Sequence, residues 1–172
     1  MWVFGYGSLM WDGWENQHGC IRRILADLFG YCRVFNKASV VNWGTKVTPC
    51  PTLNLIKMEE GVCQGIAFEF LDSQQEEVLA YLAKREGKAF KLHQMSVRLQ
   101  NDNDVLAFVP LYEGQNLIKG KSLEEIASMV AGASGNNGTC KNYIYGIARK
   151  LSELKIHDPA VTELRRKTNP QV

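Results

Sequence analysis

The alternation of apolar and polar residues predicts a chain that contains many β-strands. The alternation is clearest at residues 65–70, GIAFEF, and this period of two is typical of a strand with one face toward the core. Turn-forming residues at 59–61 and 101–104 predict hairpins between adjacent strands, so the sheet or barrel should be mostly antiparallel. Residues 18–30 show no clear pattern, and residues 36–50 are typical of a long loop. The strands are expected at residues 2–4, 31–35, 52–56, 61–70, 90–99 and 105–112.

Apolar residues at helical spacing predict four helices, which makes the fold class α+β. Two of the helices should open with capping boxes, formed by Ser73 with Glu76 and by Ser122 with Glu125. The last should begin with an aspartate cap followed by proline at the first helical position. The helices are expected at residues 73–87, 122–130, 143–154 and from residue 158 onward.

The composition is that of an ordinary globular domain. Of the 172 residues, 45% are hydrophobic and 22% are charged, which is enough for one domain with a buried core. A net charge of +2 without a long basic run argues against nucleic acid or an anionic membrane as a partner. The sequence shows no secretory signal and no run of 18 apolar residues. We therefore expect a single domain over residues 1–172, located in the cytoplasm.

The cysteines and histidines give no sign of a metal site. The number of cysteines is odd, no two have C-x-x-C spacing, and no histidine stands at zinc-finger distance, so neither a disulfide framework nor a zinc site is signalled. We expect most cysteines to be small buried hydrophobic side chains. No metal ion or cofactor is predicted. The five cysteines are Cys20, Cys32, Cys50, Cys63 and Cys140.

A glycine-containing turn, Gly5-Tyr6-Gly7-Ser8, follows the first predicted strand. Such a turn can be sharp and can present backbone N–H groups, which is the outline of an anion-binding loop. It lacks the third glycine of the dinucleotide fingerprint, the Gly-Lys-Ser/Thr of a phosphate loop and the G-x-S-x-G of a nucleophilic serine. The alternative is that the glycines only form a turn after a strand.

Glu86 stands on the apolar face of the first predicted helix, seven residues after Leu79 and four after Leu82. It also lies in the last turn, where the helix dipole disfavours a negative charge. Burial and the dipole both disfavour the charged form of its carboxyl group, which suits proton transfer near neutral pH. The alternative is that Glu86 reaches solvent or pairs with the neighbouring Lys84 or Arg85.

Three segments carry a resemblance to a known family: FGYGSLMW at residues 4–11, YLAKRE at residues 81–86, and SGNN at residues 134–137 followed by Tyr143. Their order and approximate spacing resemble those of the ChaC-like γ-glutamylcyclotransferases, over nearly the whole chain. The first two motifs together are specific to that family. The resemblance implies its fold, a small mixed and mostly antiparallel β-barrel with flanking helices.

The resemblance also implies a reaction. The free α-amine of a γ-glutamyl group attacks the γ-carbonyl of the same group, closes 5-oxoproline and expels the amine of the next residue. With glutathione, the released product is Cys-Gly. Because the nucleophile and electrophile belong to one molecule, binding the γ-glutamyl arm in a folded conformation supplies much of the catalysis. Glu86 is the candidate that takes a proton from the ammonium and returns one to the leaving amine.

The same resemblance suggests which residues bind the substrate. Tyr6, Gly7, Ser8 and Leu9 are similar to the substrate loop of the family, whose N–H groups can hold the glutamyl α-carboxylate or the developing oxyanion. Tyr143 is similar to a late tyrosine of the family, whose hydroxyl would help to position the substrate.

Two of these assignments have alternatives. Five residues, 138–142, separate the SGNN segment from Tyr143, so Tyr145 is a second candidate for the late tyrosine. Tyr143 also fits an ordinary core residue at the start of an amphipathic helix. Arg33 could attract a substrate carboxylate, or it could be a solvated arginine on a strand.

Three functions are compatible with the sequence. The first is a cyclotransferase for glutathione, and the second is a cyclotransferase for other γ-glutamyl amino acids or amines. The third is a non-catalytic module that binds a γ-glutamyl metabolite or a protein. Glu86 argues against the third, because ligand binding alone does not need a carboxyl group on an apolar helix face.

Overall fold

Two long strands, β2 (Arg22–Ser39) and β3 (Cys50–Glu69), supply residues to both of the structural units of this chain. The computed structural model describes residues 1–168. Unit 1 comprises Met1–Cys32 and Leu55–Gln115, and unit 2 comprises Arg33–Asn54 and the chain from Asn116 onward.

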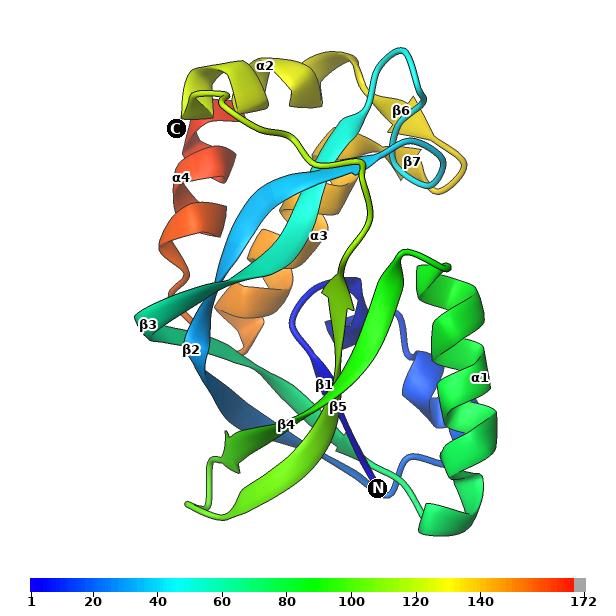
Figure 1. The fold of residues 1–172 in the computed structure, drawn as a ribbon. Coiled ribbons are helices and arrows are strands. Elements are labelled where there is room, and N and C mark those ends of the chain that lie inside the picture. Colours follow the sequence, from blue (N-terminus) through cyan, green and yellow to red (C-terminus); the bar gives the residue numbers. More distant parts are fainter. Residues whose placement is uncertain (169–172) are drawn as a thin grey trace. The chain divides into compact units, whose positions relative to one another are not determined.

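The strands form a closed barrel in the order β1, β3, β2, β4, β5 (Figure 1). β1 (Trp2–Gly5) pairs antiparallel with β3 and parallel with β5 (Asp104–Tyr112). β4 (Phe90–Leu99) pairs antiparallel with β2 and with β5. The predicted fold class, a small mixed and mostly antiparallel barrel with flanking helices, is confirmed.

The core of unit 1 is formed by alternate residues of the strands and by one face of helix α1 (Gln75–Glu86). The helix buries Val78 and Leu82 completely, as its apolar spacing predicted. Burial of side chains of this size stabilises the fold by about 1.5–3 kcal/mol each. Completely buried strand residues include Val3, Phe4, Phe68, Val97, Ala107 and Val109.

One predicted hairpin is present and the other is not. β4 and β5 pair from Phe90 with Tyr112 to Arg98 with Asp104, which confirms the turn at residues 101–104. The turn at residues 59–61 is wrong, because β3 continues through it as one strand. Gly61 does not have the positive φ of a tight hairpin turn. A Cβ at Gly61 would lie 2.9 Å from the Met58 carbonyl oxygen, so this glycine allows a close backbone approach.

Three further predicted boundaries in the first half of the chain need correction. The predicted strand at residues 31–35 is part of β2, which also includes residues without a clear pattern. Trp14–His18, where the sequence predicted neither a helix nor a strand, forms a 3₁₀ turn. The capping box predicted for Ser73 and Glu76 does not form, because a 3₁₀ turn at Asp72–Gln74 precedes α1 and the Gln74 side chain accepts a hydrogen bond from Leu71 N–H at 3.2 Å.

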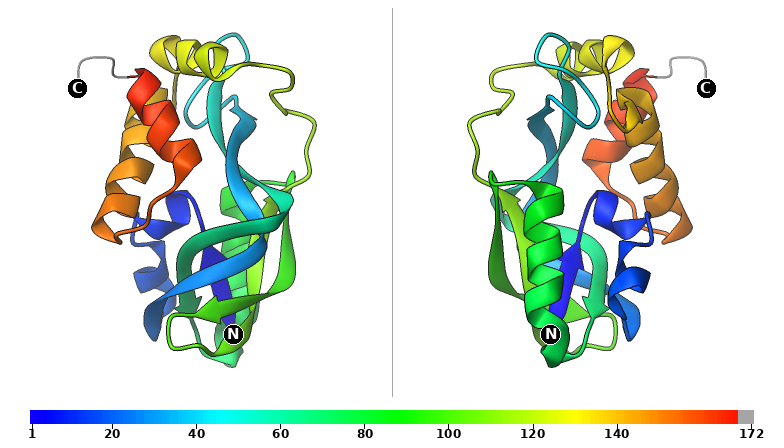
Figure 2. Two further views of the ribbon diagram at one scale, coloured as in Figure 1. Left: turned by 90° about the vertical axis from the view of Figure 1, so that its left-hand side faces the viewer. Right: turned by 90° about the vertical axis from the view of Figure 1, so that its right-hand side faces the viewer.

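Three helices of unit 2 pack against one another, with α3 and α4 side by side in both views of Figure 2. They are α2 (Leu123–Gly132), α3 (Cys140–Glu153) and α4 (Pro159–Thr168). The predicted capping box of α2 is confirmed, with Glu125 N–H donating to Ser122 Oγ at 3.2 Å and Ser122 N–H donating to Glu125 Oε2 at 2.8 Å. Among residues 1–168, no helix has both the length and the apolar character needed to cross a membrane.

Helix α3 begins three residues earlier than the sequence predicted. A short hairpin of β6 (Ser134–Gly135) and β7 (Gly138–Thr139) leads directly into it. Thr139 caps the helix, because its Oγ1 accepts a hydrogen bond from Asn142 N–H at 3.1 Å. The five residues that separate SGNN from Tyr143 are therefore β7 and the first turn of α3.

Two of the cysteines form a disulfide, Cys50–Cys140, with an S–S distance of 1.99 Å. The expectation of no disulfide is wrong at this pair. The two residues are 90 positions apart in the sequence, and only the fold brings the start of β3 to the start of α3. Cys63 is buried, as expected, while Cys20 and Cys32 are partly exposed.

Candidate active site

The turn after β1 contains the four residues that the resemblance assigns to substrate binding. Ser8–Met10 form a 3₁₀ turn, in which Met10 N–H donates to the Gly7 carbonyl oxygen at 3.0 Å. The turn itself does not use the N–H groups of Gly7, Ser8 and Leu9, because the first N–H groups of a helical turn have no acceptor within it. The turn can therefore offer main-chain donors to a ligand oxygen.

Tyr6 and Leu9 hold this turn in place within unit 1. Both are buried. The Tyr6 hydroxyl donates to the Pro110 carbonyl oxygen at 2.7 Å, and the Leu9 carbonyl oxygen accepts from Trp14 Nε1 at 3.0 Å. Tyr6 and Leu9 therefore fix the conformation of the turn, and Gly7 and Ser8 are its more exposed residues.

Glu86 is the last residue of α1. Gly87 ends the helix at a φ of +83°, a conformation that favours glycine, and its N–H donates to the Ala83 carbonyl oxygen at 3.1 Å. The Glu86 side chain is only 16% exposed, and its Oε1 lies 3.3 Å from Arg85 Nε. Burial on the apolar face and pairing with Arg85, which the sequence presented as alternatives, are both present.

Arg85 connects Glu86 to the turn after β1. Its Nη2 donates to Ser8 Oγ at 3.4 Å, and its Nη1 lies 2.6 Å from Asp12 Oδ2 and donates to the Tyr81 hydroxyl at 3.3 Å. The guanidinium group thus reaches four side chains of unit 1. Asp12 directly follows the motif at residues 4–11, and Tyr81 opens the motif at residues 81–86. The fold brings both side chains to the guanidinium of Arg85.

The surroundings keep Arg85 charged. Burial lowers the pKa of Arg85, but the Tyr81 hydrogen bond and the negative charges of Asp12 and Glu86 outweigh this effect and raise it. Tyr81 is itself held by Trp14, since the two rings stack at 5.7 Å with an interplanar angle of 8°. The buried ring of Trp14 therefore helps to fix Tyr81 beside Arg85.

Arg33 belongs to unit 2, where it is only 3% exposed. Its Nη1 donates to Asp158 Oδ2 at 3.0 Å. The other carboxylate oxygen of Asp158 accepts from Val161 N–H at 3.1 Å and so caps α4, as predicted. The alternative of a solvated arginine is wrong, because the guanidinium is buried and takes part in an ion pair.

Tyr143 also belongs to unit 2 and is buried. Its hydroxyl accepts a hydrogen bond from Leu53 N–H at 3.0 Å, and its ring lies 5.4 Å from the ring of Trp43. Tyr145 differs, because its ring is approached by Lys141 and Arg165 and its buried hydroxyl has no hydrogen-bond partner among the described residues.

Comparison with known proteins assigns the chain to a family. The family model described as ChaC-like protein matches residues 1–171. This chain belongs to the ChaC-like family. The family suggested by the motifs at residues 4–11 and 81–86 is thereby confirmed.

Individual relatives match this ChaC-like chain over most of their lengths. It is 30% identical over 182 residues to γ-glutamylcyclotransferase 2-3 of Arabidopsis thaliana, covering 95% of this chain and 86% of the relative. It is 31% identical over 172 residues to glutathione-specific γ-glutamylcyclotransferase 1 of Danio rerio, covering 92% and 84%. A solved yeast γ-glutamyl cyclotransferase specific to glutathione superposes with a TM-score of 0.88 at 20% identity, covering 99% and 96%. The fold is shared with that structure.

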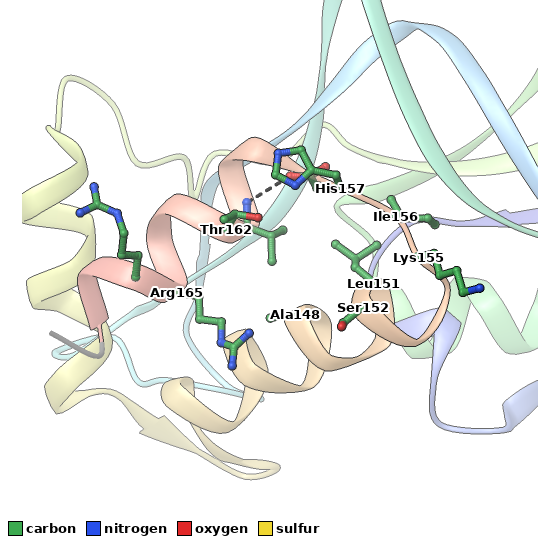
Figure 3. A pocket seen from close by; sticks show the side chains of 11 residues that line it. Ala148, Leu151, Ser152, Lys155, Ile156, His157, Thr162 and Arg165 are labelled. Atoms are coloured by element: carbon green, nitrogen blue, oxygen red, sulfur yellow. Dashed lines mark hydrogen bonds between the residues drawn. The ribbon is translucent and has the colours of Figure 1, made fainter. Parts of the chain in front are cut away.

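Unit 2 of the ChaC-like chain has a cavity of about 600 Å³ between α3 and α4 (Figure 3). Ala148, Leu151 and Ser152 line it from α3, and Thr162 and Arg165 line it from α4. None of the predicted site residues lines this cavity. Among residues 1–168, no cluster of three or more His, Cys, Asp or Glu side chains is placed to hold a metal ion.

The sequence alone did not indicate Asp12, Tyr81 and Arg85 as members of the site. Tyr81 and Arg85 stand inside the YLAKRE motif, which was the available signal, but Arg85 was considered only as a neighbour of Glu86. Asp12 lies outside every helix and strand predicted from the sequence, and nothing in its spacing indicated an ion pair with a residue 73 positions later.

Proposed function

We propose that this ChaC-like protein is a γ-glutamylcyclotransferase that converts glutathione to 5-oxoproline and Cys-Gly. The relatives from Arabidopsis thaliana and Danio rerio are named γ-glutamylcyclotransferases, and the second is named glutathione-specific. The observation that carries the proposal is the double contact of Arg85 with Glu86 Oε1 and Ser8 Oγ. Through it, the candidate acid/base group and the candidate substrate turn lie beside each other within unit 1.

In the proposed reaction, the substrate α-amine attacks its own γ-carbonyl carbon. The carboxylate of Glu86 takes a proton from the ammonium, so that the nitrogen lone pair can form the new C–N bond, and the same nitrogen then releases its second proton to solvent. When the tetrahedral intermediate collapses, Glu86 returns the proton to the departing cysteinyl amine and the old amide bond breaks. Proton transfer of this kind contributes about 10²–10⁴-fold in rate, and holding the γ-glutamyl arm folded contributes the rest through orientation.

The turn after β1 has two roles in this proposal. The N–H groups of Gly7, Ser8 and Leu9 bind the α-carboxylate of the substrate or the oxyanion that develops on the γ-carbonyl oxygen. The hydrogen bonds of the Tyr6 hydroxyl and the Leu9 carbonyl oxygen, together with the burial of both side chains, keep these donors in a fixed conformation. A fixed turn loses little conformational entropy when the substrate binds.

The remaining assignments rest on the resemblance to the family and on the composition of the chain. We propose that Tyr143 positions the substrate through its hydroxyl and that Arg33 contributes positive charge for a substrate carboxylate. We further propose that residues 1–172 act as a single catalytic domain in the cytoplasm and that the reaction uses no metal or cofactor. The partner is a small γ-glutamyl molecule rather than nucleic acid or a membrane.

The test is purified protein with glutathione, with 5-oxoproline and Cys-Gly followed by mass spectrometry. We expect the two products in equal amounts, and we expect Glu86→Gln to lower turnover by at least about 10²-fold while the fold is kept. Glu76→Gln, on the exposed side of the same helix, is the matched control and should retain turnover.

The contrary results are distinct. A folded Glu86→Gln variant with wild-type turnover would remove Glu86 from the mechanism. If wild-type protein leaves glutathione unchanged but cyclises other γ-glutamyl peptides or amines, the substrate is wrong and the activity stands. Failure of every γ-glutamyl substrate would favour a binding module.

A further inference from the structure

We propose that Arg85 is a positioning residue of the reaction, which fixes the Glu86 carboxylate and the Ser8 turn relative to each other. This inference rests on the proposed function, because it assigns Arg85 a role in the same site. Arg85 does not exchange protons with the substrate. It acts through the two groups that do contact the substrate in the proposed mechanism.

The geometry of the guanidinium supports this role, because each of its nitrogens has a separate partner. Nε lies 3.3 Å from Glu86 Oε1, Nη1 lies 2.6 Å from Asp12 Oδ2, and Nη2 lies 3.4 Å from Ser8 Oγ. A planar group with donors in fixed directions therefore determines the relative positions of three elements of unit 1. These elements are the end of α1, the turn after β1 and the loop that follows this turn.

The surroundings of Arg85 limit its movement. Its side chain is only 16% exposed, and the Tyr81 hydroxyl accepts a further hydrogen bond from Nη1 at 3.3 Å. Tyr81 cannot easily move away, since its ring stacks on the buried Trp14. A side chain held from two sides in this way can hold its own partners in place.

Asp12 has a distinct part in the cluster. Its carboxylate is the closest partner of Arg85, at 2.6 Å against 3.3 Å for Glu86. Arg85 is therefore shared between two carboxylates, and Glu86 does not hold the guanidinium alone. A Glu86 side chain in an exclusive bidentate pair would be poorly placed to turn toward a substrate amine.

Lysine cannot replace arginine in this arrangement. An ammonium group retains the positive charge but is a single point, and it cannot point three donors in the directions of Glu86, Asp12 and Ser8. Arg85→Lys therefore separates positioning from charge. We expect it to fold normally and to lower kcat for glutathione by at least tenfold, because the orientation of Glu86 is lost.

The experiment measures kcat and KM for wild type, Arg85→Lys and the matched control Arg98→Lys. Arg98 lies on β4, is half-exposed and pairs with Asp104 at 3.0 Å, so it reports the general effect of replacing a paired arginine. Arg98→Lys should keep wild-type kcat. Circular dichroism and Tm establish that each variant is folded, and Arg85→Gln serves as a second variant if Arg85→Lys is unstable.

A double-mutant cycle with Ser8→Ala distinguishes positioning from a general structural role. Ser8→Ala alone should raise KM at least twofold, since the turn loses its contact with Arg85. In the Arg85→Lys background, where that contact is already lost, Ser8→Ala should cause no further rise.

Two results would overturn the inference that Arg85 positions Glu86 and the Ser8 turn. The first is a folded Arg85→Lys variant whose kcat falls less than tenfold. The second is a rise in KM caused by Ser8→Ala that is equally large in wild type and in Arg85→Lys. These results would leave the proposed function intact, because wild type and Arg98→Lys would still turn over. If wild type itself cyclises no γ-glutamyl substrate, the proposed function fails and the inference fails with it.

Discussion

Reduction of the Cys50–Cys140 disulfide should destabilise unit 2 between the start of β3 and the start of α3. The disulfide joins the first residue of β3 to the first residue of α3. Three residues further along each element, Leu53 N–H donates to the Tyr143 hydroxyl at 3.0 Å. The disulfide and this hydrogen bond both join β3 to α3. When the disulfide is reduced, the hydrogen bond has to hold these two elements together without it.

The magnitude follows from the sequence separation of 90 between the two cysteines. In the chain-entropy model, a cross-link that closes a loop of this length stabilises the folded state by about 4.6 kcal/mol at 25 °C. Measured values for native disulfides are about 2–5 kcal/mol. At about 2–4 °C per kcal/mol for a chain of this size, a loss of about 2–5 kcal/mol should lower Tm by roughly 4–20 °C.

The assay compares wild type with and without dithiothreitol in thermal unfolding. The variant Cys50→Ala/Cys140→Ala should resemble reduced wild type and should not respond to the reductant. Cys20→Ser is the matched control, because Cys20 is outside the disulfide and serine keeps the hydrogen bond to the Arg22 carbonyl oxygen. It should retain the full response to dithiothreitol.

Amide hydrogen exchange at Leu53 gives a local measurement of the same effect. Its N–H is protected by the Tyr143 hydroxyl, and we expect faster exchange after reduction, because local opening becomes easier. A Tm that changes by less than about 2 °C, together with unchanged exchange at Leu53, would refute the reasoning. Disulfides are rare in the cytosol, so thermal unfolding in buffers with defined ratios of reduced to oxidised dithiothreitol shows how readily this disulfide is reduced.

Three further predictions concern other parts of the structure. Leu82→Ala removes a completely buried side chain of α1 and should cost about 2–5 kcal/mol of unfolding free energy in urea denaturation. Gly135→Ala should lower Tm, because the new Cβ would lie 2.5 Å from the Val41 carbonyl oxygen. Burial, followed by the charge of Glu15, raises the pKa of Cys20, so its alkylation by iodoacetamide near neutral pH should be slower than that of a free cysteine peptide.

The sequence predicted those elements whose signals are local. The alternating residues of β4 and β5 and the turn between them belong to one stretch of chain, and so do the apolar face and the glycine stop of α1. Gly61 shows the limit of this approach. A glycine that follows two glutamates marks a turn or a close backbone approach equally well, and only the fold shows the Met58 carbonyl oxygen beside it.

The candidate site was predicted in part for the same reason. Tyr6, Gly7, Ser8, Leu9 and Glu86 stand in motifs that can be recognised along the chain. The partners of these residues cannot be recognised in this way. An ion pair or a disulfide between distant positions depends on the folded path of the chain, and no periodicity in the sequence records it.

Glu86 is the position where the two predicted alternatives combine into one arrangement. A carboxylate on an apolar helix face without a partner would be costly to keep charged, whereas a carboxylate in an exclusive pair with arginine would leave a buried cation behind each time it took up a proton. In the structure, Arg85 is shared between Asp12 and Glu86. When Glu86 is protonated in the proposed reaction, Asp12 still compensates Arg85, so the proton can be taken up and returned without isolating a buried charge.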